Sequence, residues 1–171
     1  MKQLLTILAV VSLFACDEQG TRQSHHDLGW TNRVVAKSTL DSLESASSYL
    51  SIYSQINSFD RDTKQGLTVT VSMRNIYDAD TLYLSGIKSY DTAGELLHTY
   101  LTSPIYLLPL ETLEIIIDEE EEHGGTGGNF IFDWQAGTGL EPFFEAVMIR
   151  SSGQQGISFT TRGIRRDKMG E

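Results

Sequence analysis

The sequence predicts an all-β fold, a single antiparallel β-sandwich of the immunoglobulin or fibronectin kind. Segments that alternate apolar and polar residues recur about eight times over roughly 115 residues. Turn signals separate them at intervals of about 8 to 12 residues, and no long helical pattern interrupts them. A small β-barrel, which is built from the same kind of segment, is the alternative. No internal repeat of fixed period is present, which disfavours a solenoid or a propeller.

The clearest strand is predicted at Leu67–Asn75, where Leu67, Val69, Val71 and Met73 alternate with polar residues. This pattern indicates one buried and one solvent-facing side. Further strands are expected at residues 49–55, 82–90, 95–101, 112–118, 129–134, 145–150 and 157–162.

Local signals refine several of these strands. The alternation breaks at Gly86, which indicates a β-bulge, and Asp91–Gly94 has the composition of a tight hairpin turn. Pro104 and Pro109 bracket a short apolar piece that suits a crossover or an edge, since proline cannot donate a ladder hydrogen bond. Residues 145–150 are apolar on both faces, as expected of a central strand.

The N-terminus predicts a lipoprotein signal peptide at residues 1–15, with lipidation of Cys16. Lys2 precedes an apolar run that ends at Ala15, and Leu13 and Ala15 occupy the positions that lipoprotein processing requires. The run is about half of the roughly 20 residues that a transmembrane helix needs. An ordinary secretory signal cut near Ala15 is the alternative, but it would leave an unpaired thiol in an oxidising compartment.

The remaining chain divides into three parts. Residues 16–47 are polar and predict a tether, residues 48–163 predict the β-sandwich domain, and residues 164–171 form a charged tail.

The charge balance excludes some partners. The formal net charge is −10, and it becomes −11 when residues 1–15 are removed, because Lys2 is the one charged residue among them. Binding to nucleic acid needs clustered Lys and Arg, which occur here only in the C-terminal tail. The same balance disfavours electrostatic docking to anionic lipid. The acyl chains on Cys16 are therefore expected to supply the membrane contact.

A glycine-rich segment is the candidate ligand loop. It contains Gly124, Gly125, Gly127, Gly128 and Asn129. It lacks the Lys-Ser/Thr of a phosphate-binding loop and precedes a strand where such a loop would precede a helix, which disfavours a nucleotide site. A hairpin connection that uses positive φ angles is favoured over a ligand-contacting lip.

Five consecutive carboxylates at Asp118–Glu122 precede this loop. Glu119, Glu121 and His123 are weak candidates for metal ligands. Cation-binding loops space their acidic ligands alternately, whereas a solid run repels itself into solvent, so a solvated loop is favoured. No Gly-x-Ser-x-Gly nucleophile elbow occurs, so no catalytic residue is assigned and no cofactor is expected.

Several motifs resemble a family of bacterial secreted proteins known only as a domain of unknown function. They are the lipoprotein signal, Leu67–Asn75, Tyr90-Asp91 with Gly94, Gly124–Phe130, Glu145–Ile149 and Gln155–Phe159. The resemblance covers about residues 49–163. It implies a β domain of the cell envelope and brings no activity and no catalytic residues with it.

We therefore expect a lipid-anchored, non-catalytic binding or assembly module of the bacterial cell envelope, with an envelope protein as its partner. The alternative is a cation-binding or catalytic domain that uses the acidic run and the glycine loop. A fold of this class hosts many functions and does not decide between the two.

Overall fold

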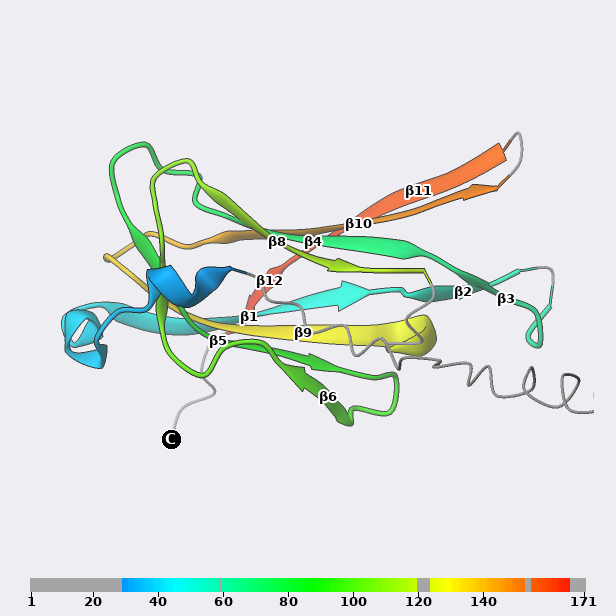
Figure 1. The fold of residues 1–171 in the computed structure, drawn as a ribbon, viewed down its shortest axis with the longest axis horizontal. Coiled ribbons are helices and arrows are strands. Elements are labelled where there is room, and N and C mark those ends of the chain that lie inside the picture. The colour runs from blue at the N-terminus through cyan, green and yellow to red at the C-terminus, as the bar shows by residue number, and fades with distance from the viewer. Residues whose placement is uncertain (1–28, 59, 120–123, 153–154, 167–171) are drawn as a thin grey trace, which may run out of the picture.

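Two antiparallel sheets pack face to face in the computed structural model of the chain (Figure 1). The structure describes residues 29–58, 60–119, 124–152 and 155–166. Its strands are β1 (Glu44–Ile52), β2 (Gln55–Asn57), β3 (Lys64–Gly66), β4 (Thr68–Arg74), β5 (Leu82–Tyr90), β6 (Leu96–Thr99), β7 (Ile105–Leu107), β8 (Thr112–Ile117), β9 (Gly128–Ala136), β10 (Phe143–Ser152), β11 (Gln155–Arg162) and β12 (Ile164–Arg166). Three short 3-10 helices complete the described elements: η1 (Trp30–Arg33), η2 (Lys37–Leu40) and η3 (Gly125–Gly127).

The first sheet has the order β12-β1-β9-β5-β6, with β7 also paired to β5, and the second has the order β11-β10-β4-β8. Strands β2 and β3 form a separate hairpin. Neither large sheet closes on itself, so the predicted sandwich is confirmed and the barrel alternative is wrong. None of the described helices is long and apolar enough to cross a membrane.

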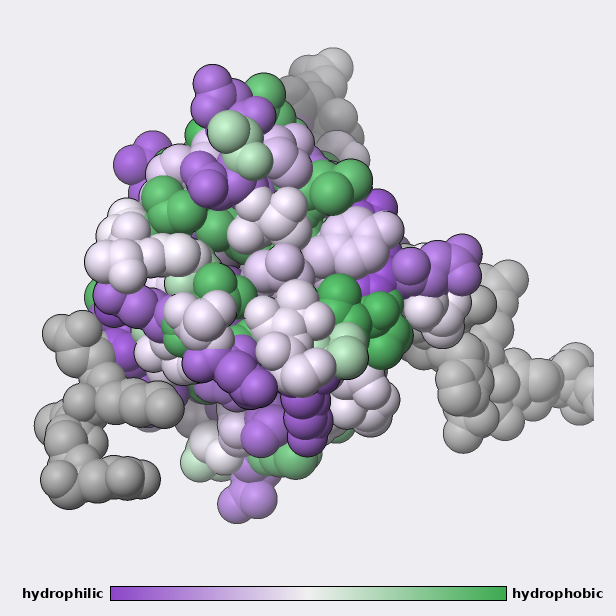
Figure 2. All heavy atoms as spheres, turned by 90° about the vertical axis from the view of Figure 1, so that its left-hand side faces the viewer, coloured by the Kyte–Doolittle hydropathy of each residue, from purple (hydrophilic) through white to green (hydrophobic). Residues whose placement is uncertain are grey.

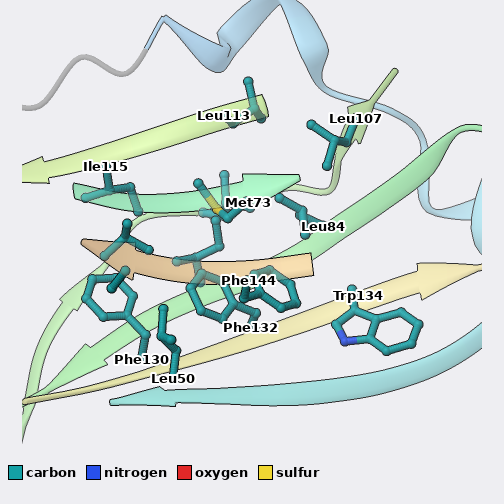
Figure 3. Close-up of a cluster of buried hydrophobic side chains, with 14 of the residues drawn as sticks. Leu50, Met73, Leu84, Leu107, Leu113, Ile115, Phe130, Phe132, Trp134 and Phe144 are labelled. Atoms are coloured by element: carbon teal, nitrogen blue, oxygen red, sulfur yellow. The ribbon is translucent and has the colours of Figure 1, made fainter. Parts of the chain in front are cut away.

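The core lies between the two sheets and follows the period of two that the sequence predicted. Leu67, Val69, Val71 and Met73 are fully buried. From the opposite sheet, β9 contributes the inward-facing Phe130, Phe132 and Trp134 (Figure 3). The rings of Phe132 and Phe144 stack between the sheets with centroids 4.2 Å apart. This contact joins β9 of the first sheet directly to β10 of the second.

The bulge expected in β5 and the tight turn expected after it are both confirmed. The β5–β9 register shifts between Leu84 and Gly86, where the bulge was expected. An added Cβ at Gly86 would lie 2.7 Å from a carboxylate oxygen of Asp133, so a side chain at the bulge position would displace this carboxylate. The N–H of Gly94 donates to the carbonyl of Asp91 at 3.1 Å, and Gly94 has φ 86°, as the tight turn requires.

The first sheet extends beyond the predicted domain limits of 48 and 163 at both ends. Strand β1 begins at Glu44, inside the predicted tether, because its buried face carries Ala46 and Ser48 before the first large apolar residue. Ser48 is buried because its hydroxyl accepts the indole N–H of Trp134 at 3.0 Å. Strand β12 lies in the predicted charged tail and pairs with β1.

Strand β10 refines one expectation. It is internal to its sheet, but it is buried on one face only: Ala146 and Met148 point into the core, whereas Ile149 is 46% exposed. The expected central position is confirmed, but the apolar residues of the outer face stay partly exposed, because no helix or third layer covers that side in the described part of the chain.

The chain crosses between the sheets at Gly163. Its N–H donates to the carbonyl of Phe144 at 2.8 Å, after which the chain leaves β11 and pairs with β1 as β12. An added Cβ at Gly163 would lie 2.8 Å from the Cβ of Phe144, so this crossing requires glycine.

Replacing Met73 by Asp tests the position of the core. We expect Met73→Asp to lower the free energy of unfolding by several kcal/mol, comparable to the total for a small domain, because an unpaired carboxylate would be buried between the sheets. Urea unfolding followed by circular dichroism measures the loss. The matched control is Ile116→Asp on neighbouring β8, where the side chain is 46% exposed and the change should be small. Equal losses in the two variants would contradict the assignment of faces.

Candidate functional site

The predicted ligand loop lies at one end of the sandwich, beneath the hairpin turn at Asp91–Gly94. The hydroxyl of Thr92 donates to the carbonyl of Gly124 at 2.7 Å. Gly124 and Gly125 have φ angles of 85° and 64°, which confirms the expected use of positive φ in this segment. An added Cβ at Gly125 would lie 3.0 Å from the Thr92 hydroxyl oxygen, so the turn packs closely on the loop.

The side chain of Asn129 is occupied by contacts within the protein. Its amide nitrogen donates to the carbonyls of Asp91 and Gly127, each at 3.1 Å. Its amide oxygen accepts the hydroxyl of Tyr49 at 2.7 Å. Gly127 and Gly128 pack under Thr92 and Ile52 respectively. These contacts favour the interpretation of the loop as a hairpin connection over a lip that contacts a ligand.

The acidic run is described only in part. Asp118 and Glu119 are exposed, whereas Glu121 and His123 lie outside the described residues. A carboxylate oxygen of Glu119 lies 3.7 Å from the Nε of Arg150 on β10. Among the residues that the structure describes, no three His, Cys, Asp or Glu side chains are grouped so that they could hold a metal ion. Cys16 also lies outside the described residues.

The opposite end of the sandwich carries a more elaborate arrangement, which the sequence did not suggest. Asn75 follows β4 and is 2% exposed. Its amide nitrogen donates to the carbonyls of Asp80 at 2.7 Å and Leu107 at 3.1 Å, and its amide oxygen accepts the N–H of Tyr77. The carbonyl of Tyr77 in turn accepts the N–H of Leu110 at 3.0 Å. One buried amide thus ties the β4–β5 loop to the β7–β8 loop.

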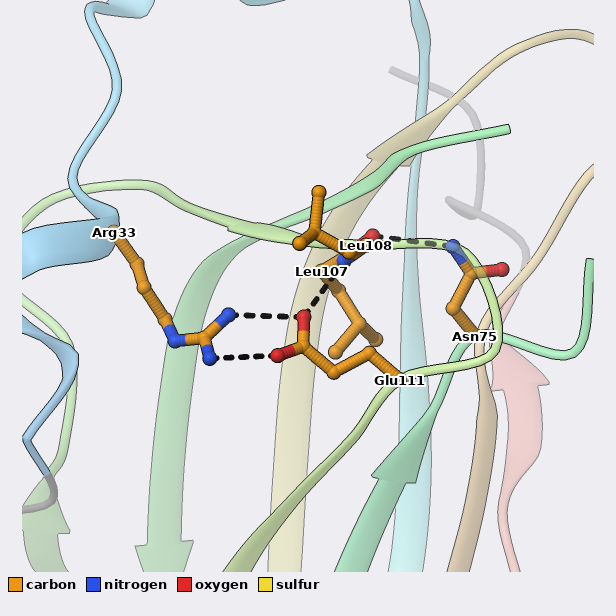
Figure 4. Close-up of polar contacts among 5 residues, drawn as sticks. All are labelled: Arg33, Asn75, Leu107, Leu108 and Glu111. Atoms are coloured by element: carbon orange, nitrogen blue, oxygen red, sulfur yellow. Dashed lines mark hydrogen bonds and ion pairs between the residues drawn. The ribbon is translucent and has the colours of Figure 1, made fainter. Parts of the chain in front are cut away.

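Glu111 fixes the second of these loops to η1 (Figure 4). One of its carboxylate oxygens lies 2.6 Å from the Arg33 guanidinium. The other accepts hydrogen bonds from Arg33 at 2.9 Å and from the N–H of Leu108 at 2.8 Å. The guanidinium also lies over the ring of Tyr106, 5.5 Å from its centroid. Because Arg33 precedes Glu111 by 78 residues, no sequence spacing could have paired them.

The electrostatics of Glu111 combine two opposed effects. Burial alone would raise the pKa of Glu111, but the hydrogen bonds from Arg33 and Leu108 and the positive charge of Arg33 lower it below the ordinary value of 4.5. The hydrogen bond to Glu111 also raises the pKa of Arg33. The pair is therefore ionised at neutral pH and ties the loop to η1.

The two joined loops present apolar side chains to solvent. We call Ile76, Leu108 and Leu110 the loop-end patch; they are 56%, 47% and 69% exposed. Leu110 has φ 58°, and it is the one described residue other than glycine with a positive φ. Figure 2 views the sandwich from this end, where hydrophobic residues lie between hydrophilic ones. Exposed apolar side chains with polar neighbours, on loops tied together by hydrogen bonds, are suited to contacting a protein surface.

The ion pair predicts a pH dependence. The pKa of Glu111 is lower in the folded than in the unfolded state, so the stabilisation is complete above 4.5 and is lost as the pH falls through the lowered pKa. We expect Glu111→Gln to cost roughly 1 kcal/mol near pH 7 and less near pH 3. Urea unfolding at both pH values measures this difference. Glu95→Gln, at an exposed carboxylate of the β5–β6 turn, is the control. An equal cost of Glu111→Gln at both pH values would contradict this role of the ion pair.

Comparison with known proteins gives the family. A solved structure entitled "Crystal Structure of Thermotoga maritima 1070" matches with a TM-score of 0.44 and 9% sequence identity, over 70% of this chain and 92% of that chain. No curated protein matches the sequence. The model of the family described as "Protein of unknown function (DUF3124)" matches residues 45–165, most of the chain and nearly all of both sheets, which confirms the resemblance to a family without an assigned function. The chain belongs to this family.

Proposed function

We propose that this protein is a lipid-anchored module of the bacterial cell envelope, which binds or assembles with an envelope protein and does not catalyse a reaction. The loop-end patch is the observation that carries the proposal. It combines exposed apolar side chains with loops whose conformation is fixed by Asn75 and Glu111. A surface that is ordered before binding loses less conformational entropy when a partner docks.

The conformation of Leu110 supports a role in recognition. A left-handed backbone costs about 1 kcal/mol or more at a residue with a Cβ, and glycine or asparagine would avoid much of this cost. At 69% exposure the Leu110 side chain also gains little from burial in the free protein. A partner that covers Leu110 would offset both costs.

The anchor rests on the sequence that ends in Leu13-Phe14-Ala15-Cys16. The 12 residues between Cys16 and Gly29 reach up to about 45 Å when extended. The anchored domain can then contact proteins beside it in the membrane or project from the surface. Because the mature chain has a net charge of −11, it is not attracted to anionic lipids, and the acyl chains supply the attachment to the membrane.

Acylation of Cys16 is tested by metabolic labelling with a fatty-acid analogue, followed by membrane fractionation. We expect the full-length chain to be labelled and to sediment with membranes, and we expect Cys16→Ala to remain unlabelled because it lacks the acceptor thiol. Ser24→Ala in the predicted tether is the control and should be labelled normally. An unlabelled wild-type chain would overturn the lipid anchor.

The role of the loop-end patch is tested with Leu110→Asn. Asparagine accepts a positive φ, so we expect an unchanged or higher melting temperature. When intact envelopes are treated with a chemical cross-linker, we expect the wild-type protein to form an adduct with an envelope protein, at a mass other than that of two copies of this chain, and we expect Leu110→Asn to lose this adduct. Ile116→Asn, at an exposed position on the face of β8, is the matched control and should retain the adduct. An adduct that persists in Leu110→Asn would show that the patch is not the binding surface.

A further inference from the structure

The edges of the two sheets differ in how well they are protected against pairing with another strand. An edge strand presents unpaired backbone groups, and proteins commonly block such edges with short strands, charged side chains, proline or bulges. In the first sheet, β12 has three residues, of which Arg165 and Arg166 are charged. Strand β6 has four residues, and its register with β5 shifts between Ser89 and Tyr90. Strand β7 also has only three residues.

The β8 edge of the second sheet is acidic. Glu114 is exposed within the strand, and Asp118 and Glu119 follow it. Two such strands brought together would place carboxylates close to one another, which disfavours pairing.

Strand β11, at the other edge of the second sheet, has none of these devices over most of its length. It pairs with β10 without a shift through eight consecutive residue pairs. Its segment Gln155–Thr160 contains no charged residue and no proline. Every residue of this segment is exposed except Phe159, which is half-buried against Tyr53. Figure 1 shows β11 at the margin of its sheet, running out beyond the body of the sandwich.

The open part of this edge ends at Thr161. The Thr161 hydroxyl donates to the carbonyl of Ser51 on β1 at 2.6 Å, and Gly163 then takes the chain to the first sheet. Among the strands that the structure describes, the residues before Thr161 pair on the β10 side only. The unprotected edge is therefore Gln155–Thr160.

We infer that Gln155–Thr160 pairs antiparallel with the same segment of a second copy of this chain. Twofold symmetry places the same neutral segment on both sides of the contact, so no like charges oppose each other in any register within it. The pairing joins two four-stranded sheets into one sheet of eight strands, and it covers the open β11 edge of each copy. It also covers Ile157, which is 41% exposed in the single chain.

The charge of the chain gives this contact a definite salt dependence. Each copy carries a net charge of −10 before processing, so two copies repel each other at long range. The paired segments themselves are neutral, and salt screens only the repulsion between the bodies. Dimerisation therefore strengthens as the salt concentration rises, the opposite of a contact made by ion pairs.

The test uses the full-length chain purified in mild detergent, with its mass measured by size exclusion and light scattering. We expect the wild-type mass to be that of two chains, and Ile157→Lys to halve it, because an edge lysine carries a charge into the pairing strand. The matched control is Ile164→Lys on β12, where the native side chain is 65% exposed. It should retain the dimer mass. The two variants carry the same N-terminus and the same loop-end patch, so the difference between their masses tests the β11 contact separately from the proposed function.

Three results would overturn the inference: a wild-type chain that stays monomeric at the highest concentration and salt tested, an Ile157→Lys variant that remains dimeric, or an Ile164→Lys variant that dissociates equally. Circular dichroism establishes that each variant is folded. Should Ile157→Lys fail to fold, Ser158→Lys on the same edge replaces it, since Ser158 is exposed.

Discussion

The burial of alternate side chains between the two sheets is the constraint on which the rest of this structure depends. Phe132 of β9 stacks on Phe144 of β10, and Phe130 extends the same row of rings toward Tyr100. Each buried Phe contributes about 1.5 to 3 kcal/mol, and a one-residue slip of β9 would turn the row toward solvent. The register of the first sheet is thus fixed by the requirement that this row meet the second sheet.

The rigid loops at one end follow from this packing. Met73 and Leu107 are fully buried, and they stand directly before the loops that Asn75 and Glu111 organise. Because both strand ends are fixed in the core, a few hydrogen bonds are enough to hold the intervening backbone. The loop-end patch can then expose apolar side chains without collapsing onto the domain. Strand β11 depends on the same packing through its partner, because β10 contributes Phe144, Ala146 and Met148 to the core.

The sequence predicted the parts of the fold in which burial and hydropathy agree. Strand β4 was recognised because its inward residues are apolar, and the bulge at Gly86 because it breaks that pattern. The start of β1 was missed because Ser48 is buried through a hydrogen bond to Trp134, and a serine carries no hydrophobic signal. Strand β12 was missed because an edge strand with two arginines resembles a charged tail.

The candidate site was beyond sequence reasoning for a related reason. The ion pair of Arg33 with Glu111 joins a segment predicted as a tether to a loop between two strands. The fold brings these two residues together, and no local sequence pattern indicates that they pair. The glycine loop, by contrast, was found from its composition, and its preferred interpretation as a connection agrees with the internal hydrogen bonds of Asn129.

The distribution of charge connects the two proposed contacts. The chain as a whole is strongly acidic, yet the loop-end patch and the Gln155–Thr160 edge are both made of uncharged residues. Association through such surfaces depends on apolar burial and backbone hydrogen bonds, while the acidic body keeps other surfaces of the chains apart. The carboxylates on and after β8 then have a role that needs no ligand. They repel a second strand from the β8 edge, so β11 is the edge of the second sheet that is open to pairing. An acidic body with two neutral contact surfaces can thus restrict both which parts of the molecule associate and how many copies join.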